Sequence, residues 1–216
     1  MENLDKRESC LNVEQHFAKH GWAYVPNLVE KYECEMLTNH LLFLDDQGKM
    51  KKDRLCSISS SIYGDSILDK FLELNRSKIS KLINISLLPT YTYARIYKTK
   101  EVLPIHRDRP SCEISATITL GNDENSKIWP FFFSKINGFE DVHRQVIEVG
   151  GAVLYRGMDL WHWRQEYRGK WQTQVFLHYV DANGKYADQA YDGREGLGSR
   201  KRIKKPLLHH PSEIKE

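Results

Sequence analysis

Hydrophobic residues in the first third of the chain recur at the spacing of amphipathic helices. A short helix is predicted from Asn12, its N-cap, to Gly21, where it ends. Longer helices are predicted from Glu30 to Leu44 and from Asp65 to Asn84, each with one apolar stripe. The apolar run Trp22 to Val29 between the first two is typical of extended chain, and the polar stretch Asp45 to Tyr63 predicts a surface connection.

After Pro89 the hydrophobic period changes to two, which indicates β-strands. From 91 to 97 one face carries Tyr91, Tyr93, Arg95 and Tyr97, while the other carries Thr92, Ala94 and Ile96. The segment 113–120 divides in the same way, so one face predicts core and the other a polar, aromatic pocket. Further strands are predicted at 128–133, 145–149, 152–156 and 172–180, with Asn137-Gly138 and Gly150-Gly151 as hairpin turns.

Helices followed by many short strands predict an α+β protein, a β-sandwich or jelly roll with N-terminal helices packed on one sheet. A chain of 216 residues fits a single domain. Residues 1–89 are expected to be mainly helical support and 90–181 the jelly-roll core. Residues 182–216, rich in Gly, Lys and Arg, are expected to form a basic C-terminal extension that is either peripheral or a partly disordered tail.

The charge pattern excludes some classes of partner. A formal net charge of +3 is too small to favour nucleic acid, and the basic residues of the C-terminal extension are typical of a solvated terminus. The sequence predicts neither a secretory signal nor a bilayer-spanning run, so we expect a cytoplasmic protein without a membrane partner. Four cysteines without C-x-x-C spacing predict reduced, mostly buried thiols.

The segment Pro104 to Pro110 carries candidate metal chemistry, because His106 and Asp108 stand two residues apart. Side chains two apart in extended backbone point to the same face, so both could bind one ion. A second histidine from another strand would complete the two-His, one-carboxylate triad of non-haem Fe(II) oxygenases. Of the nine histidines, His162 is favoured because it follows an apolar strand and a turn. His178 is the alternative, but it lies in an apolar run where a hydrogen-bonded core histidine is common.

Taken together, these residues resemble the 2-oxoglutarate- and Fe(II)-dependent oxygenases, specifically the prolyl 4-hydroxylase-like branch. The resemblance covers roughly 89–180 and rests on the segments 93–97 (YARIY), 108–113 (DRPSCE), 154–157 (LYRG) and 162–164 (HWR). It implies a double-stranded β-helix, the jelly roll of this family, supported by helices. It also implies that His106, Asp108 and His162 hold Fe(II) and that 2-oxoglutarate and O2 are consumed, with release of succinate and CO2.

The resemblance further implies residues that hold the 5-carboxylate of 2-oxoglutarate. Lys170 precedes Trp171, as a lysine precedes a tryptophan before the last core strand of prolyl 4-hydroxylases. The gap from His162 is two residues shorter than in those enzymes, so Arg164 and Arg168 are alternative anchors. Tyr97 matches a family tyrosine, and Ser115 takes the place of a family threonine, both of which donate to this carboxylate.

The expected substrate is a protein side chain such as proline, or a small molecule. Asp108 favours hydroxylation over halogenation, because by family analogy a small residue in its place would open a coordination site for halide. Two alternatives stay open: a non-catalytic β-sandwich binding module, and a cupin-like metalloenzyme that does not use 2-oxoglutarate.

Overall fold

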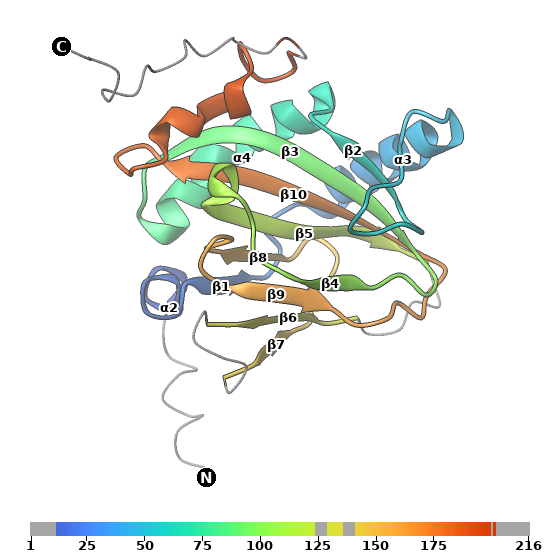
Figure 1. Ribbon diagram of the computed structural model, residues 1–216, viewed down its shortest axis with the longest axis horizontal. Helices are drawn as coiled ribbons and strands as arrows, with labels where there is room; N and C mark the ends of the chain where they lie inside the picture. The colour runs from blue at the N-terminus through green and yellow to red at the C-terminus, as the bar shows by residue number, and fades with distance from the viewer. Residues whose placement is uncertain (1–11, 124–128, 136–140, 200, 202–216) are drawn as a thin grey trace, which may run out of the picture.

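Two β-sheets packed face to face form the body of the protein (Figure 1). The computed structural model describes residues 12–123, 129–135, 141–199 and 201. The larger sheet has the order β1-β8-β5-β10-β3-β2 and the smaller one β4-β9-β6-β7, and all paired strands are antiparallel. Their bounds are β1 Trp22–Val25, β2 Ser60–Tyr63, β3 Leu87–Lys98, β4 Leu103–His106, β5 Ile114–Asn122, β6 Phe131–Ser134, β7 His143–Gln145, β8 Ala152–Tyr155, β9 Trp161–Arg164 and β10 Trp171–Asp181.

From β3 onward the chain passes back and forth between the two sheets. Strands β3, β5, β8 and β10 belong to the six-stranded sheet, whereas β4, β6, β7 and β9 belong to the four-stranded one. This winding is the double-stranded β-helix form of the jelly roll, so the predicted α+β fold class is confirmed. Because the two sheets face each other, side chains on their inner faces enclose the space between them.

The three described α-helices lie where the sequence predicts, to within about two residues. Helix α2 (Val13–His20) begins after Asn12, whose side chain accepts from the Gln15 backbone N–H, and ends at Gly21 with φ 78°. Helix α3 spans Lys31–Asp46. Helix α4 (Ser66–Ile83) begins after Asp65, which caps two backbone N–H groups. It ends at Asn84, whose φ of 53° lies in the left-handed region that favours Gly and Asn.

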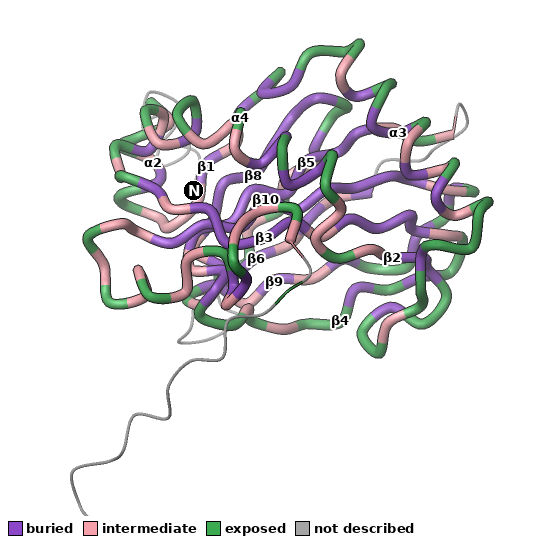
Figure 2. The backbone as a smooth tube through the Cα atoms, turned by 90° about the horizontal axis from the view of Figure 1, so that it is seen from above, coloured by how far each residue is buried: buried purple, intermediate pink, exposed green. Residues whose placement is uncertain are grey.

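Helices α3 and α4 cover the outer face of the six-stranded sheet, and the four-stranded sheet lies against its inner face (Figure 1). The apolar stripes of these helices pack on alternate residues of the strands, which places a hydrophobic core between helices and sheet. This core includes Leu37, Leu41, Leu68, Leu72, Ile96, Ile118 and Leu177, each at most 1% exposed. Figure 2 shows the strands buried along most of their length, with exposed residues gathered in connections and on the outer helix faces.

Several strand predictions need correction. Strands β2, β4 and β9 were not predicted, because they are too short and too mixed in polarity to show a period. Strand β7 begins before the predicted 145–149 and ends at Gln145. Gly150-Gly151 is not a hairpin turn, because it joins β7 to β8, which belong to different sheets. Gly150 has φ 83°, and a Cβ there would lie 2.6 Å from the Val29 carbonyl oxygen, so the backbone itself requires glycine. Asn137-Gly138 lies outside the described residues.

The C-terminal extension is not peripheral in its described part, which is a second correction. Its 3-10 segment η2 (Ala187–Gly193) packs against β3 and β10. Asp192 and Arg194 are buried, and Arg194 donates to Asp69 at 2.6 Å. Burial here depends on paired charges, which leave no hydrophobic period in the sequence.

Two further expectations concern cysteines and membranes. Cys34, Cys56 and Cys112 are free thiols and buried, as expected, whereas Cys10 lies outside the described residues. Among the described residues, every helix is too short or too polar to cross a bilayer.

Candidate active site

A cavity of about 440 Å³ opens between the two sheets. The six-stranded sheet contributes residues of β3 and β10 to its wall, and the four-stranded sheet contributes residues of β4, β6 and β9. Tyr91, Tyr93 and Arg95 line it, as the alternation along β3 predicts, and Tyr97 is fully buried further along the same face. The connection that contains Asp53 to Leu55 covers one side of the cavity.

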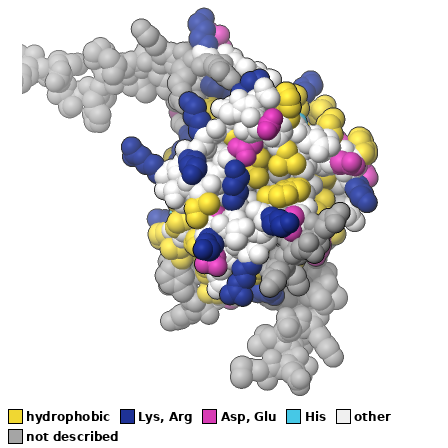
Figure 3. Space-filling model, turned by 90° about the vertical axis from the view of Figure 1, so that its right-hand side faces the viewer, with side chains coloured by type: hydrophobic (Ala, Val, Ile, Leu, Met, Phe, Trp, Pro, Cys, Tyr) yellow, Lys and Arg dark blue, Asp and Glu magenta, His cyan; other side chains and the backbone are white. Residues whose placement is uncertain are grey.

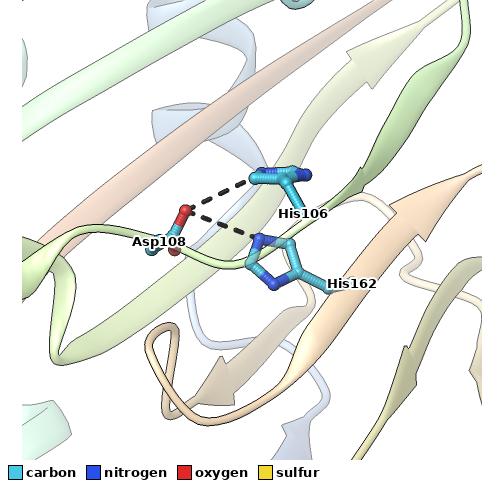
Figure 4. A group of neighbouring side chains, drawn as sticks. All are labelled: His106, Asp108 and His162. Atoms are coloured by element: carbon cyan, nitrogen blue, oxygen red, sulfur yellow. Dashed lines mark ion pairs between the residues drawn. The ribbon is translucent and has the colours of Figure 1, made fainter. Parts of the chain in front are cut away.

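Three side chains meet in this cavity: His106 at the end of β4, Asp108 in the loop that follows, and His162 on β9 (Figure 4). The Asp108 Oδ1 atom lies 3.7 Å from the His106 Nε2 and 3.5 Å from the His162 Nε2. One ligand atom from each residue lies within 4.8 Å of the other two. The three side chains can therefore contact one metal ion, and His178 is not needed as the third ligand.

The backbone explains why these side chains converge. His106 stands directly opposite His162 in the β4–β9 pairing, which sets the two imidazoles side by side. The loop after β4 is held by the Asp108 backbone N–H, which donates to the Gly157 carbonyl oxygen at 2.9 Å. A Cβ on Gly157 would lie 2.4 Å from the Asp108 Oδ2, so only glycine leaves room for the carboxylate. The segment from His106 to Asp108 thus supplies two of the candidate ligands, and the pairing of β4 with β9 supplies the third, His162.

Both imidazoles are oriented to present Nε2 to a metal. His106 Nδ1 lies 2.7 Å from the Pro104 carbonyl oxygen, and His162 Nδ1 lies 2.9 Å from the Leu160 carbonyl oxygen. A carbonyl only accepts, so each Nδ1 carries a proton and donates, which leaves Nε2 as the nitrogen available to a metal. Metal-binding histidines commonly donate their other N–H in this way.

The charge states also suit metal binding. Burial and, to a smaller extent, the neighbouring His162 lower the pKa of His106 to about 4. Burial would raise the pKa of Asp108, but His162, His178 and His106 outweigh it and hold the pKa below its usual value. At neutral pH His106 is neutral and Asp108 is ionised, which are the forms that coordinate cations.

A buried arginine lies among aromatic side chains between the sheets. Arg164, two residues after His162 on β9, is 1% exposed, and its Nη1 donates to the Trp129 carbonyl oxygen at 2.7 Å. Its Nη2 is buried with no hydrogen-bond partner, and no ion pair to it occurs among the described residues. Burial lowers its pKa to about 10. A buried cation without an anion is costly, so this position suits a carboxylate that enters from outside the chain.

Tyr97 lies close to two arginines. Arg95 Nη1 donates to the Tyr97 hydroxyl at 2.9 Å. Burial raises the pKa of Tyr97, although the charges of Arg95 and Arg164 oppose this. Its hydroxyl is therefore protonated and can donate to a carboxylate beside either arginine.

The other anchor candidates lie elsewhere. Lys170 and Arg168 are exposed in the turn before β10, outside the residues that line the cavity. The Lys170 backbone N–H donates to Asp123, which ties this turn to the end of β5 and away from the cavity. Ser115 is buried, and its hydroxyl lies 2.8 Å from His178 Nδ1 and donates to the Cys112 carbonyl oxygen at 3.3 Å. Arg164 and Tyr97 are thus buried between the sheets, whereas Lys170 and Arg168 are exposed.

The sequence did not identify Asp53 as a partner for Arg95. Arg95 Nη2 and the Tyr93 hydroxyl both donate to the Asp53 Oδ2 at 2.5 Å. Asp53 lies in a polar connection that has no period, so no signal in the sequence could have paired the two residues. His178 was treated as a core histidine, and it does hydrogen-bond Ser115, yet it also lines the cavity beside Asp108.

No protein-family profile and no curated protein sequence matches this chain. Solved structures do. A prolyl-4-hydroxylase from Pseudomonas putida superposes with a TM-score of 0.64 at 15% identity, covering 78% of this chain and 97% of that one. HygX from Streptomyces hygroscopicus, solved with nickel and 2-oxoglutarate bound, gives 0.62 at 12% identity, covering 87% and 93%.

A prolyl hydroxylase from Trichoplax adhaerens, in complex with a hypoxia inducible factor peptide fragment, gives a TM-score of 0.63 at 14% identity, covering 82% of this chain and 90% of that one. Similarity at this level of identity establishes the fold. The chain has the jelly-roll fold of the 2-oxoglutarate- and Fe(II)-dependent oxygenases, as the resemblance implied.

Proposed function

We propose that this protein is an Fe(II)- and 2-oxoglutarate-dependent dioxygenase that hydroxylates a protein side chain or a small molecule and releases succinate and CO2. The observation that carries the proposal is the triad of His106, Asp108 and His162, which stands inside the cavity of an oxygenase-type jelly roll. Two histidines and one carboxylate leave coordination positions open for other ligands, which is the arrangement that non-haem Fe(II) chemistry requires.

The donor set fits the metal. Two imidazole nitrogens and one carboxylate oxygen suit Fe(II), and the hydrogen bonds at both Nδ1 atoms prevent the imidazoles from turning away. When bound, iron with 2-oxoglutarate supplies the oxidising power for C–H hydroxylation. The protein positions the ligands and excludes water. Leu103, Phe131 and Phe176 form an apolar wall around the triad that limits the access of water.

We propose Arg164 as the anchor for the 5-carboxylate, with Tyr97 as a hydroxyl donor. Its burial, its unused Nη2 and the lack of an acidic partner for it among the described residues support this role over Lys170 and Arg168, both exposed. A guanidinium can hold a carboxylate through two parallel hydrogen bonds. Arg95 is a weaker candidate because Asp53 already neutralises its charge.

The test is anaerobic addition of Fe(II) and 2-oxoglutarate to the purified protein. A visible charge-transfer band is expected, since both the metal and the keto acid must bind together to produce it. The Asp108→Ala variant is expected to lose the band. Absence of the band in the intact protein, with iron binding retained, would favour the cupin-like alternative, and absence of iron binding would favour the non-catalytic module.

The peptide or small-molecule substrate and the cytoplasmic location remain predictions from the sequence. Similar structures include one with a peptide fragment bound and HygX with hygromycin B bound, so this fold admits both kinds of substrate. On the face shown in Figure 3, acidic and hydrophobic side chains stand between the Lys and Arg side chains. A nucleic-acid site would present a continuous basic stripe.

A further inference from the structure

We propose that the substrate carries a carboxylate or phosphate group, and that Arg54 and Arg107 hold this group at the mouth of the cavity. The inference rests on the proposed function and extends it by naming the chemical class of the substrate. Three observations support it: the number of charged residues around the cavity, the way each of them is paired, and the contacts that hold the two chain segments with unpaired arginines.

Four arginines and two aspartates line the cavity. Asp108 belongs to the metal triad. Asp53 is paired with Arg95 at 2.5 Å. Arg109 is held by Asp192 through two hydrogen bonds, of 2.5 and 2.9 Å, so its charge is also balanced. After these pairs are formed, Arg54 and Arg107 remain as cations with no ion-pair partner in the part of the chain that the structure describes.

Arg107 is fixed in place without being neutralised. It lies between His106, which pairs with β9, and Asp108, whose backbone N–H donates to the Gly157 carbonyl oxygen, so its backbone is held on both sides. Its guanidinium stacks over the Trp161 ring at 4.8 Å from the ring centre. Stacking on an aromatic ring orients an arginine but leaves its N–H donors and its full charge available. Arg107 is exposed, so these donors are open to a ligand that enters the cavity.

Arg54 is positioned by the residue before it. The Asp53 carboxylate accepts hydrogen bonds from Arg95, from Tyr93 and from the backbone N–H groups of Leu55 and Cys56. These contacts tie the connection to the wall of the cavity, which keeps Arg54 at its mouth. Arg54 is exposed and its own charge is not used in these contacts.

Two uncompensated arginines give the mouth of the cavity a positive potential, which attracts anions and speeds their association. An anionic group can accept parallel hydrogen bonds from a guanidinium, and such charge-assisted bonds are about twice as strong as neutral ones. A neutral substrate that covered these arginines would remove them from water without replacing their hydrogen bonds, at a net cost. A cationic substrate would meet repulsion in addition. The pairing pattern therefore selects for an anionic substrate.

The first test is a screen for succinate formation above the rate without substrate, using the iron-loaded enzyme with 2-oxoglutarate and O2. Two sets of compounds are used, small molecules and short peptides, and each acidic compound is matched by an analogue with carboxamide for carboxylate or hydroxyl for phosphate. Stimulation is expected from the acidic compounds and not from their analogues, and the set that contains the stimulators shows which source supplies the anion. Equal stimulation by the neutral analogues would overturn the proposal.

Variants locate the effect. For an acidic stimulator, Arg107→Gln and Arg54→Gln are each expected to lower kcat/KM about tenfold or more, because each removes a charge-assisted hydrogen bond. Arg144→Gln, an exposed arginine on β7 outside the cavity, is the matched control and is expected to change nothing. Added salt is expected to lower kcat/KM for the wild type more than for Arg107→Gln. A change below twofold in both cavity variants would refute the assignment.

A binding measurement decides the case in which no compound stimulates. The arginine side-chain N–H signals of the protein loaded with Zn(II) and 2-oxoglutarate are followed by NMR while phenyl phosphate, or phenol as the neutral control, is added to millimolar concentration. The signals that disappear in Arg54→Gln and Arg107→Gln are expected to shift with phenyl phosphate only. No shift, or the same shift with phenol, would overturn the proposal. Failure of the parent function is distinguished beforehand by the absence of the Fe(II) and 2-oxoglutarate band.

Discussion

The two faces of the six-stranded sheet are built from the same strands but differ in role. One face packs against the helices, and the other faces the second sheet and the cavity. On β10, Val175, Leu177 and Tyr179 point to the helices and belong to the large hydrophobic core. The residues that alternate with them face the other sheet. Among these, Gln174 donates to Thr117 at 2.7 Å and His178 lies beside Asp108. Alternation along a strand therefore separates a stabilising face from a chemical one at each step.

The contrast lies in how the buried groups are satisfied. The helix-facing side is apolar and gains stability from area removed from water. The space between the two sheets instead buries two histidines and two arginines, His162, His178, Arg95 and Arg164, and Arg164 has no acidic partner among the described residues. Groups left in this state destabilise the empty protein and become favourable only when a ligand supplies the missing charge. The cavity side is therefore organised for what it binds.

The largest expected effect is on the cavity side. Asp108→Ala removes the anionic ligand of the triad and is expected to lower Fe(II) affinity by more than about 100-fold, because even partners one step removed from a metal are worth about 10- to 100-fold. Equilibrium dialysis measures the affinity, and circular dichroism is expected to show an unchanged fold. Retained iron affinity would show that the triad is not the metal site.

A second substitution on the same side separates function from stability. Arg164→Met is expected to raise the KM for 2-oxoglutarate by more than about 100-fold, since losing one partner of a buried charge pair costs about 3–5 kcal/mol. The Tm of the ligand-free protein should be unchanged or higher, because an unpaired buried cation is removed. A lower Tm with an unchanged KM would mean that Arg164 is only structural.

The opposite face is expected to give the opposite result. Leu177→Ala on β10 removes a fully buried side chain from the core under the helices and is expected to cost about 2–5 kcal/mol of unfolding free energy. Denaturant titration measures this loss. Iron affinity below the unfolding transition should stay within about twofold, because sites without shared contacts act almost independently. A large loss of iron affinity would show that the two faces are coupled.

A smaller effect is expected at the rim, where the C-terminal extension meets the cavity. Burial opposes ionisation of Asp192, but hydrogen bonds from Arg109, Tyr63 and Ser111 outweigh it and lower its pKa to about 2. A depressed pKa contributes stability above the unfolded value, and this contribution is lost as pH falls through the folded pKa. It amounts to about 2 kcal/mol at neutral pH.

The unfolding free energies of wild type and Asp192→Asn should therefore differ at pH 7 and converge between pH 4 and about 2. A difference that does not depend on pH in this range would contradict the ion pair with Arg109. Chemical denaturation at a series of pH values measures the two curves.

The smallest effect is expected for Lys170→Ala. Lys170 is exposed, and in the part of the chain that the structure describes its hydrogen bond to Asp123 is made by the backbone N–H, which a change of side chain leaves intact. The KM for 2-oxoglutarate should stay within about twofold of the wild type, as is usual for surface substitutions. A rise like that of Arg164→Met would restore Lys170 as the anchor and remove Arg164 from the role.

Local patterns in the sequence determined the helices and the long strands. Caps at Asn12 and Asp65 and the left-handed end at Asn84 are properties of neighbouring residues, so α2 and α4 could be predicted almost to the residue. The period of two along β3 likewise predicted which tyrosines face the cavity. The spacing of His106 and Asp108 predicted a shared ligand position for the same local reason.

Tertiary structure decided the contacts between residues distant in sequence. Strand pairing set His162 opposite His106, although β4 and β9 are too short to be recognised by period. The partnership of Asp53 with Arg95, the burial of Arg164 and the return of Asp192 to Arg109 each join separate segments. Neither the ion-pair partner of a charged residue nor its burial can be predicted from the residues next to it in the sequence. The residues predicted to hold the metal therefore follow from the sequence, whereas the cations proposed to hold the co-substrate and the substrate follow only from the fold.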